Sequence, residues 1–108
     1  MDFDEYQRGA RRTAVYAERH RVVYPALGLA SEAGEVAGKI KKVLRDADGD
    51  LAAAPRDALE DELGDVLWYL AVLASDLGLS LDQIAQHNLD KLRSRQDRGM
   101  LGGSGDRR

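Results

Sequence analysis

The sequence of 108 residues contains no cysteine, which excludes a disulfide framework and any metal site built on thiolates. Long apolar runs are also missing, since no window approaches the roughly 18 apolar residues of a membrane span. The N-terminus is acidic and polar, unlike a signal peptide. A net charge of −3 gives no attraction toward nucleic-acid polymers or anionic membranes. We therefore expect one helix-rich globular protein in the cytoplasm, with no membrane and no nucleic-acid partner.

Histidine is scarce, and its two positions argue against metal sites that need imidazole. Helical bundles that hold two iron ions place a glutamate three residues before a histidine. The residues three positions before His20 and His87 are Ala17 and Ile84. Iron and zinc are therefore disfavoured, and both histidines are expected to be exposed or to lie at helix ends.

Apolar side chains recur at helical spacing in four stretches of the chain. These stretches are residues 2–21, residues 25–45, residues 55–77 and residues 81–98. Pro25 interrupts or restarts the pattern after the first stretch, and Pro55 suits the first turn of the third helix. Gly78 suits a helix end, and Ser80 with Gln83 forms a capping box before the fourth helix. The pattern predicts an all-α four-helix bundle.

Glycine is frequent inside the second predicted helix and near the end of the chain. Gly28, Gly34 and Gly38 each cost roughly 1 kcal/mol of helix stability relative to alanine. Such glycines usually admit the close approach of another helix or of a ligand. Residues 99–108 are too rich in glycine for regular structure, so we expect a helical domain over residues 1–98 and a flexible tail.

Two pairs of carboxylates stand at helical spacing inside the apolar second and third stretches. Glu32 and Glu35 form the first pair, and Glu62 and Asp65 form the second. A spacing of three residues places both acids of a pair on one helix face. Burying such acids without a partner costs on the order of several kcal/mol each, which a shared cation removes. Carboxylates without imidazole favour Mg²⁺ or Mn²⁺, although ordinary surface acids remain an alternative for either pair alone.

A polar face on the fourth predicted helix is formed by Asn88, Lys91 and Arg95. Basic residues near a helix C-terminus complement the helix dipole, which is one explanation of this face. The other explanation is a phosphate clamp, in which arginine supplies a planar fork and lysine a point charge. The residues themselves do not separate the two explanations.

Three stretches of the sequence together resemble MazG-like nucleotide pyrophosphohydrolases, members of the all-α NTP pyrophosphatase superfamily. They are residues 27–36 with the first acid pair, residues 62–70 with the second, and residues 88–95 with the polar face. The ending Gly-Ser-Gly-Asp-x-Arg is similar to that of short phage and bacterial members. The resemblance covers about residues 25–98. The same superfamily includes dimeric dUTPases and phosphoribosyl-ATP pyrophosphatases.

The resemblance implies a metal site, a phosphate site and an assembly. Four carboxylates are expected to hold Mg²⁺, with Mn²⁺ possible: Glu32, Glu35, Glu62 and Asp65. Four polar side chains are expected to contact the triphosphate: Lys91 and Arg95, with Lys39 and Asn88 as additional contacts. The implied assembly is a homodimer or homotetramer whose sites are completed by partner subunits.

The implied activity is hydrolysis of nucleoside triphosphates, deoxynucleotides included, to a monophosphate and pyrophosphate. Glu35 or Glu62 would orient or deprotonate the attacking water. Trp68 and Tyr69 are candidates for stacking on the base, although large aromatic side chains more often pack in a core or an interface. The tail could fold over the phosphates through the amides of its glycines and the charge of Arg107.

Two other functions remain open at this point. One is a narrow substrate specificity, for dUTP, dCTP or phosphoribosyl-ATP. The other is a non-catalytic helical module that oligomerises through its apolar faces and releases no pyrophosphate.

Overall fold

The computed structural model describes all 108 residues and contains helices but no strands. Its four α-helices are α1 (Phe3–Arg12), α2 (Val23–Ala47), α3 (Arg56–Asp76) and α4 (Leu81–Asp97). Short 3-10 turns interrupt two of the connections: η1 (Glu18–His20) before α2, and η2 (Leu51–Ala53) before α3. The predicted all-α class with four helices is confirmed.

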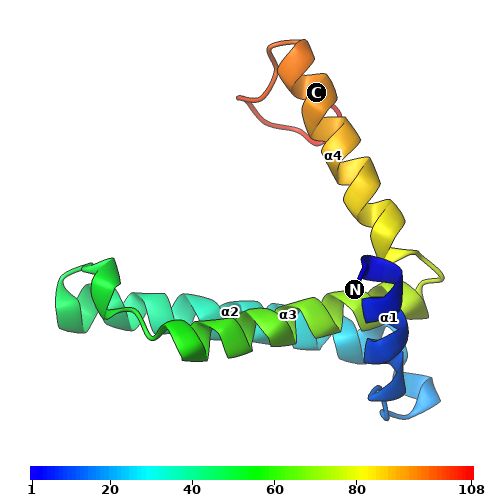
Figure 1. Ribbon diagram of the computed structural model, residues 1–108, viewed down its shortest axis with the longest axis horizontal. Coiled ribbons are helices and arrows are strands. Elements are labelled where there is room, and N and C mark those ends of the chain that lie inside the picture. Colours follow the sequence, from blue (N-terminus) through cyan, green and yellow to red (C-terminus); the bar gives the residue numbers. More distant parts are fainter.

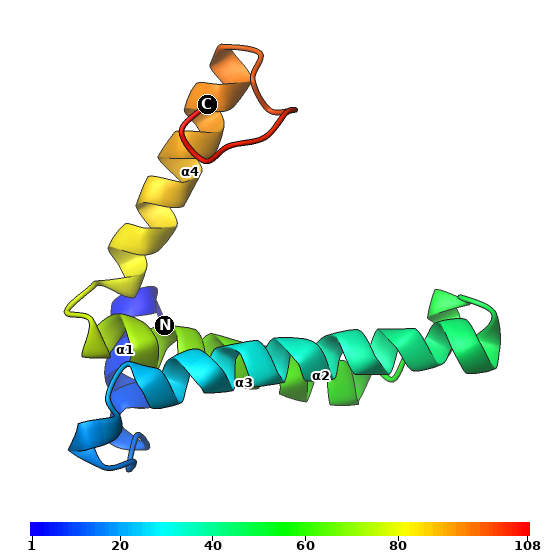
Figure 2. The same ribbon diagram turned by 180° about the vertical axis from the view of Figure 1, so that it is seen from behind.

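Helices α2 and α3 run side by side as a long hairpin, and the other two helices meet only one end of it (Figure 1). Helix α1 crosses that end, and α4 leaves it at a bend of 104° from α3. The view from behind shows α4 standing clear of the hairpin (Figure 2). A single chain therefore does not close α4 against the other helices as a complete bundle would require.

The first helix is much shorter than the spacing of apolar residues predicted. It ends at Arg12 because Thr13 closes its last turn, donating both its N–H and its hydroxyl to the carbonyl of Ala10. Helix α2 starts two residues before Pro25, which lies in the first turn, where an amide N–H has no partner within the helix. Pro55 precedes α3 as its N-cap residue instead of lying in its first turn. Ser80 caps α4 as predicted, since its side chain accepts from the N–H of Gln83, which is one of the two hydrogen bonds of a capping box.

Asp76, the last residue of α3, ties three segments of the chain together. Its carboxylate is fully buried and accepts hydrogen bonds from Arg11 at 2.9 Å, the Tyr16 hydroxyl at 2.5 Å and the Val22 N–H at 2.9 Å. Arg21 adds a second positive charge at 3.5 Å. Burial is the largest single influence on the pKa of Asp76 and would raise it. The hydrogen bonds and the two arginines together outweigh burial, so the pKa of Asp76 is lowered.

Val22 adopts a backbone conformation that is strained for a β-branched residue, with φ 67° and ψ −56°. The Val23 N–H donates to the Arg21 carbonyl at 2.7 Å, which makes this a γ-turn. The turn points the Val22 N–H at Asp76. The buried carboxylate thus helps to hold the strained turn that starts α2.

The chain buries little of itself. Only 8 of its 108 residues are buried, and the main cluster consists of Ala10, Ala71, Val72 and Leu81, where α1, α3 and the start of α4 meet. The accessible surface is 7748 Å², whereas a compact monomer of 11.9 kDa exposes about 5,900 Å². The radius of gyration is 16.8 Å, against roughly 13 Å for a compact domain of this length. This open shape leaves many large apolar side chains in contact with solvent.

Exposed leucines occur on three of the four helices. They include Leu27 and Leu44 of α2, Leu63 of α3, and Leu89 and Leu92 of α4. No single helix is long and apolar enough to cross a bilayer. Only α3 and α4, counted together across their bend, reach the length and hydropathy of a candidate span.

Candidate metal centre

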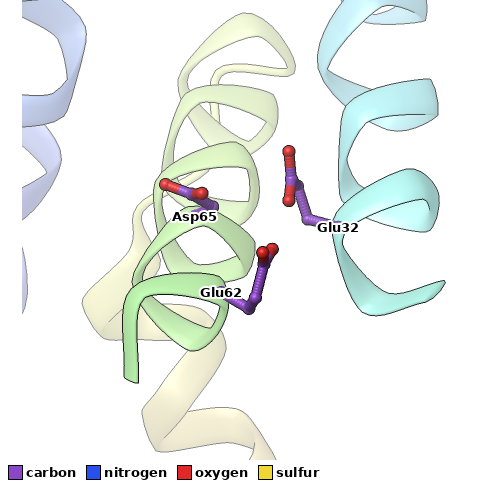
Figure 3. Close-up of side chains that lie close together, drawn as sticks. All are labelled: Glu32, Glu62 and Asp65. Atoms are coloured by element: carbon purple, nitrogen blue, oxygen red, sulfur yellow. The ribbon is translucent and has the colours of Figure 1, made fainter. Parts of the chain in front are cut away.

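Three of the four predicted metal ligands come together between α2 and α3. Glu32 projects from α2 toward Glu62 and Asp65, which lie one turn apart on α3 (Figure 3). One carboxylate oxygen from each of the three residues lies within 4.8 Å of the other two. The spacing of three residues puts Glu62 and Asp65 on the helix face turned toward α2, as the sequence predicted.

The charge of this cluster is poorly compensated within the chain. The pKa of Glu32 is raised, first by its pairing with the Glu62 carboxyl, then by burial and by the negative charges of Glu62, Asp65 and Glu35. The pKa of Glu62 is lowered, first by the same pairing and then by Lys39. One oxygen of Glu62, Oε2, is buried and has no hydrogen-bond partner. A cluster of hard oxygen donors with an unpartnered buried oxygen suits a divalent cation such as Mg²⁺.

Glu35 and Lys39 lie one and two turns along α2 from Glu32, and the structure gives them different places. Glu35 is exposed and is close enough to raise the pKa of Glu32, but its oxygens lie outside the group of three. The Lys39 ammonium lies 3.2 Å from Glu62 Oε1. Lys39, predicted to contact phosphate, is therefore the one cation paired with the cluster in this structure.

Tyr69 of α3 packs on α2 near the cluster. Its ring lies against Gly28, where an added Cβ would overlap the ring. Nothing lies within 4 Å of a Cβ at Gly34 or Gly38, so close approach explains only the first of the three glycines. The pKa of Tyr69 is raised, first by its pairing with the Tyr24 hydroxyl, then by burial, and also by the charges of Glu32 and Asp65. The Tyr69 phenol therefore lies close enough to Glu32 and Asp65 for their charges to affect it.

Trp68 faces a shallow pocket of about 330 Å³ beside this tyrosine. The pocket is lined by Trp68 with Thr13, Val15, Tyr16 and Tyr24. The Trp68 indole N–H donates to the Thr13 hydroxyl at 2.8 Å. The Tyr16 and Tyr24 rings stack with centroids 4.9 Å apart. Tyr24 lies between the pocket and Tyr69, with ring centroids 6.2 Å apart. An open aromatic pocket is therefore linked to the carboxylate cluster through Tyr24 and Tyr69.

The predicted phosphate contacts on α4 do not lie with the carboxylates in a single chain. Lys91 and Arg95 are in the second half of α4, and Asn88 is next to its midpoint. This helix points away from the α2–α3 hairpin (Figure 1). Asn88 is exposed. The Arg95 side chain is 6% exposed because the C-terminal segment covers it, whereas Lys91 is 39% exposed. His20 and His87 are both exposed.

The C-terminal segment contacts the basic residues through Asp106, which the sequence analysis did not single out. Asp106 Oδ1 accepts from Lys91 Nζ at 2.7 Å and lies 3.3 Å from the Arg95 guanidinium, which also donates to the Asp106 carbonyl. The pKa of Asp106 is lowered, chiefly by Lys91 and then by Arg95. The glycine-rich ending drew attention to backbone amides and Arg107, so its one acid was overlooked.

The fold and the cluster define an all-helical protein with a candidate centre for a divalent cation. Residues 25–100 match the family described as the MazG nucleotide pyrophosphohydrolase domain. The chain therefore belongs to the MazG family, a generally metal-dependent family of hydrolases.

One relative can be compared over the whole chain. The "Gene 37 protein" of Mycobacterium phage L5 is 47% identical over 114 aligned positions, which cover 100% of both chains. Its printed name states no activity. No solved structure shows significant similarity to the chain.

Proposed function

We propose that the protein hydrolyses nucleoside triphosphates, deoxynucleotides included, to a nucleoside monophosphate and pyrophosphate in a Mg²⁺-dependent reaction. The observation that carries the proposal is the cluster of Glu32, Glu62 and Asp65 with its unpartnered buried oxygen, in a chain of the MazG family. Bound Mg²⁺, or Mn²⁺ in its place, would screen the phosphate charges and make a bound water more acidic. A cytoplasmic location is part of the proposal, because the substrates are metabolic nucleotides.

The carboxylates have separate roles in this proposal. Glu32, Glu62 and Asp65 would hold the cation, since their oxygens converge. Glu35 is exposed beside them and outside the group of three, so it is free to orient the attacking water and accept its proton. Lys39, now paired with Glu62, would be the nearest ammonium for a phosphate oxygen once a cation neutralised that carboxylate.

The aromatic pocket is the proposed site of the nucleobase. It lies on the α1 side of the cluster, and Tyr24 and Tyr69 connect it with the acids. A base that enters the pocket would stack on Trp68. A base that lies closer to the cluster would instead meet the ring of Tyr69. Its open side sets no clear limit on base size, which favours a broad substrate range over a narrow one.

The protein acts as a homodimer or homotetramer in this proposal. The surplus surface, the exposed leucines and the open position of α4 are typical of a subunit whose partner covers it. Helix α4, which carries Asn88, Lys91 and Arg95, leaves the α2–α3 hairpin that carries the carboxylates (Figure 1). In the assembly, α4 of one subunit would carry these side chains to the acid cluster of the other.

A panel of ribonucleoside and deoxyribonucleoside triphosphates, with and without Mg²⁺, tests the proposed reaction. Pyrophosphate should appear as the first product, and chelation of the metal should stop its release. Orthophosphate as the first product would contradict the mechanism. Turnover confined to dUTP, dCTP or phosphoribosyl-ATP would identify a narrow-specificity enzyme, and no turnover at all would favour a helical oligomerisation module.

A further inference from the structure

The last ten residues form a closed loop against the end of α4 (Figure 2). Gly99 ends α4 with φ 68°, and the Met100 N–H returns to the Arg95 carbonyl. The Arg108 guanidinium then gathers the loop by donating to four carbonyls at 2.7 to 3.2 Å: those of Met100, Leu101, Gly102 and Gly105. Gly103 and Gly105 take the positive φ values that this closed path requires.

The loop brings one charged side chain onto the two cations of α4. Lys91 and Arg95 are four residues apart on a helix, so their like charges repel each other. Asp106 Oδ1 lies between them and contacts both. Arg95 is covered by this contact, yet its Nε is buried without a hydrogen-bond partner. Burying the guanidinium is tolerable because Asp106 supplies the opposite charge and a carbonyl acceptor.

The two cations differ in what they can still reach. Arg95 has almost no exposed surface while the loop is closed, so it is not available to a ligand. Lys91 is 39% exposed, and only one of its three N–H donors has a partner. The loop is held by the Arg108 hydrogen bonds as well as by Asp106, so an anion arriving at Lys91 does not need to open it.

We propose that Asp106 is a positioning residue, which fixes the Lys91 ammonium for a phosphate group of the substrate and is itself anchored by Arg95. This inference rests on the proposed function, and it changes the predicted clamp, because Lys91 touches the substrate while Arg95 holds the loop. A lysine has many rotamers, and a carboxylate at 2.7 Å restricts them before the substrate arrives. The substrate then meets an ammonium that is already oriented.

Steady-state kinetics of Asp106→Asn test the inference, because this change removes the charge but preserves the shape and the backbone carbonyl. KM for the triphosphate should rise about three- to tenfold, the cost of immobilising one flexible side chain, with kcat changed less than KM. Asp106→Glu should restore part of the loss. Asp97→Asn is the matched control, since Asp97 is an exposed acid at the end of α4 with no hydrogen-bonded or ionic partner. It should leave KM unchanged.

A double variant shows whether Asp106 acts through Lys91. In a Lys91→Ala background, Asp106→Asn should cause no further rise in KM. A further rise of the same size would overturn the inference, because Asp106 would then act by another route. A fall in KM for Asp106→Asn alone would also overturn it, since Asp106 would then compete with the substrate.

Calorimetric titration with inorganic tripolyphosphate separates this inference from the proposed reaction. Binding weakened by Asp106→Asn but not by Asp97→Asn supports the positioning role, and equal or tighter binding overturns it. A wild-type protein that binds tripolyphosphate but releases no pyrophosphate from any nucleotide contradicts the proposed function while leaving the positioning role standing. A fully active wild-type protein with an unaffected Asp106→Asn variant contradicts the positioning role alone.

Discussion

The acidic centre and the basic end of α4 are organised in opposite ways. The acids lie on two helices that pack along each other, and three of them converge within one chain. The basic residues lie on a helix that leaves the hairpin, and their partner is a loop next to them in sequence. The acidic centre therefore takes its geometry from tertiary packing, and Lys39 is its one counter-charge. The basic end takes its geometry from local structure and leaves one cation to be used.

Removing one carboxylate from the acidic centre should give the largest effect. Glu62→Gln takes away the ligand with the unpartnered buried oxygen, so turnover should fall by at least about 100-fold. Binding of Mn²⁺, followed by electron paramagnetic resonance, should weaken in parallel, with helicity unchanged by circular dichroism. Glu60→Gln changes an exposed acid two residues away and serves as the control. Normal metal binding by Glu62→Gln would remove the centre from the proposal.

Mixing two impaired variants tests whether the two regions work across subunits. Glu62→Gln lacks an acidic ligand, and Lys91→Ala lacks the basic contact. If α4 serves the cluster of its partner, co-refolded mixtures should recover about a quarter of wild-type activity, as expected for random pairing in a two-fold dimer. Each variant refolded by itself should stay well below that level. A mixture no more active than its components would place both groups in one chain.

Asp76 lies at the end of the hairpin from which α4 departs, and it should make stability depend on pH. Its pKa is lowered in the folded chain, so the stabilisation is complete above the unfolded value of about 3.9 and is lost as pH falls through the folded pKa. Asp76→Asn should lower the unfolding free energy at neutral pH by roughly 2–3 kcal/mol. The stability of the Asp76→Asn variant should also fall less on acidification than that of the wild type. Urea unfolding at several pH values measures both; identical pH profiles would exclude this role.

The contact between α2 and Tyr69 should produce the smallest effect, and its sign should depend on position. Gly28→Ala gains helix propensity but drives a methyl group into the Tyr69 ring, so we expect a net loss of about 1–2 kcal/mol. Gly34→Ala meets nothing in the chain and should gain up to about 1 kcal/mol. Thermal unfolding of the two variants compares them directly. A stabilising Gly28→Ala would mean that the ring moves away at little cost.

Sequence spacing predicted the acidic centre because helical periodicity is local information. The interval between Glu62 and Asp65 fixes their common face, and the apolar residues around them fix the face that packs on α2. The spacing also suggested that Glu35 would join the group, but the crossing of α2 over α3 brings only Glu32 close. That crossing depends on side-chain packing, which periodicity does not encode.

The helix that ended early and the loop at the end of the chain were harder to predict for a different reason. Residues 14–21 continue an apolar pattern, yet the chain turns so that Tyr16 reaches Asp76, about sixty positions later. The position of α4 follows from the tight turn at Gly78 and from the surface that the α2–α3 hairpin leaves uncovered. The spacing of apolar residues within α4 encodes neither. The pairing of Asp106 with Lys91 and Arg95 needs the path of the loop, which Arg108 determines through hydrogen bonds to backbone carbonyls.

The small core of the isolated chain has a consequence for the proposed assembly. A chain that buries 8 of 108 residues gains little free energy from packing against itself, so in that assembly association would supply much of the rest. By mass action, the melting temperature should rise as the protein accumulates. Dilution would then weaken both the fold and any site shared between subunits. The level to which the protein is synthesised would set the onset of its activity, with no separate regulator.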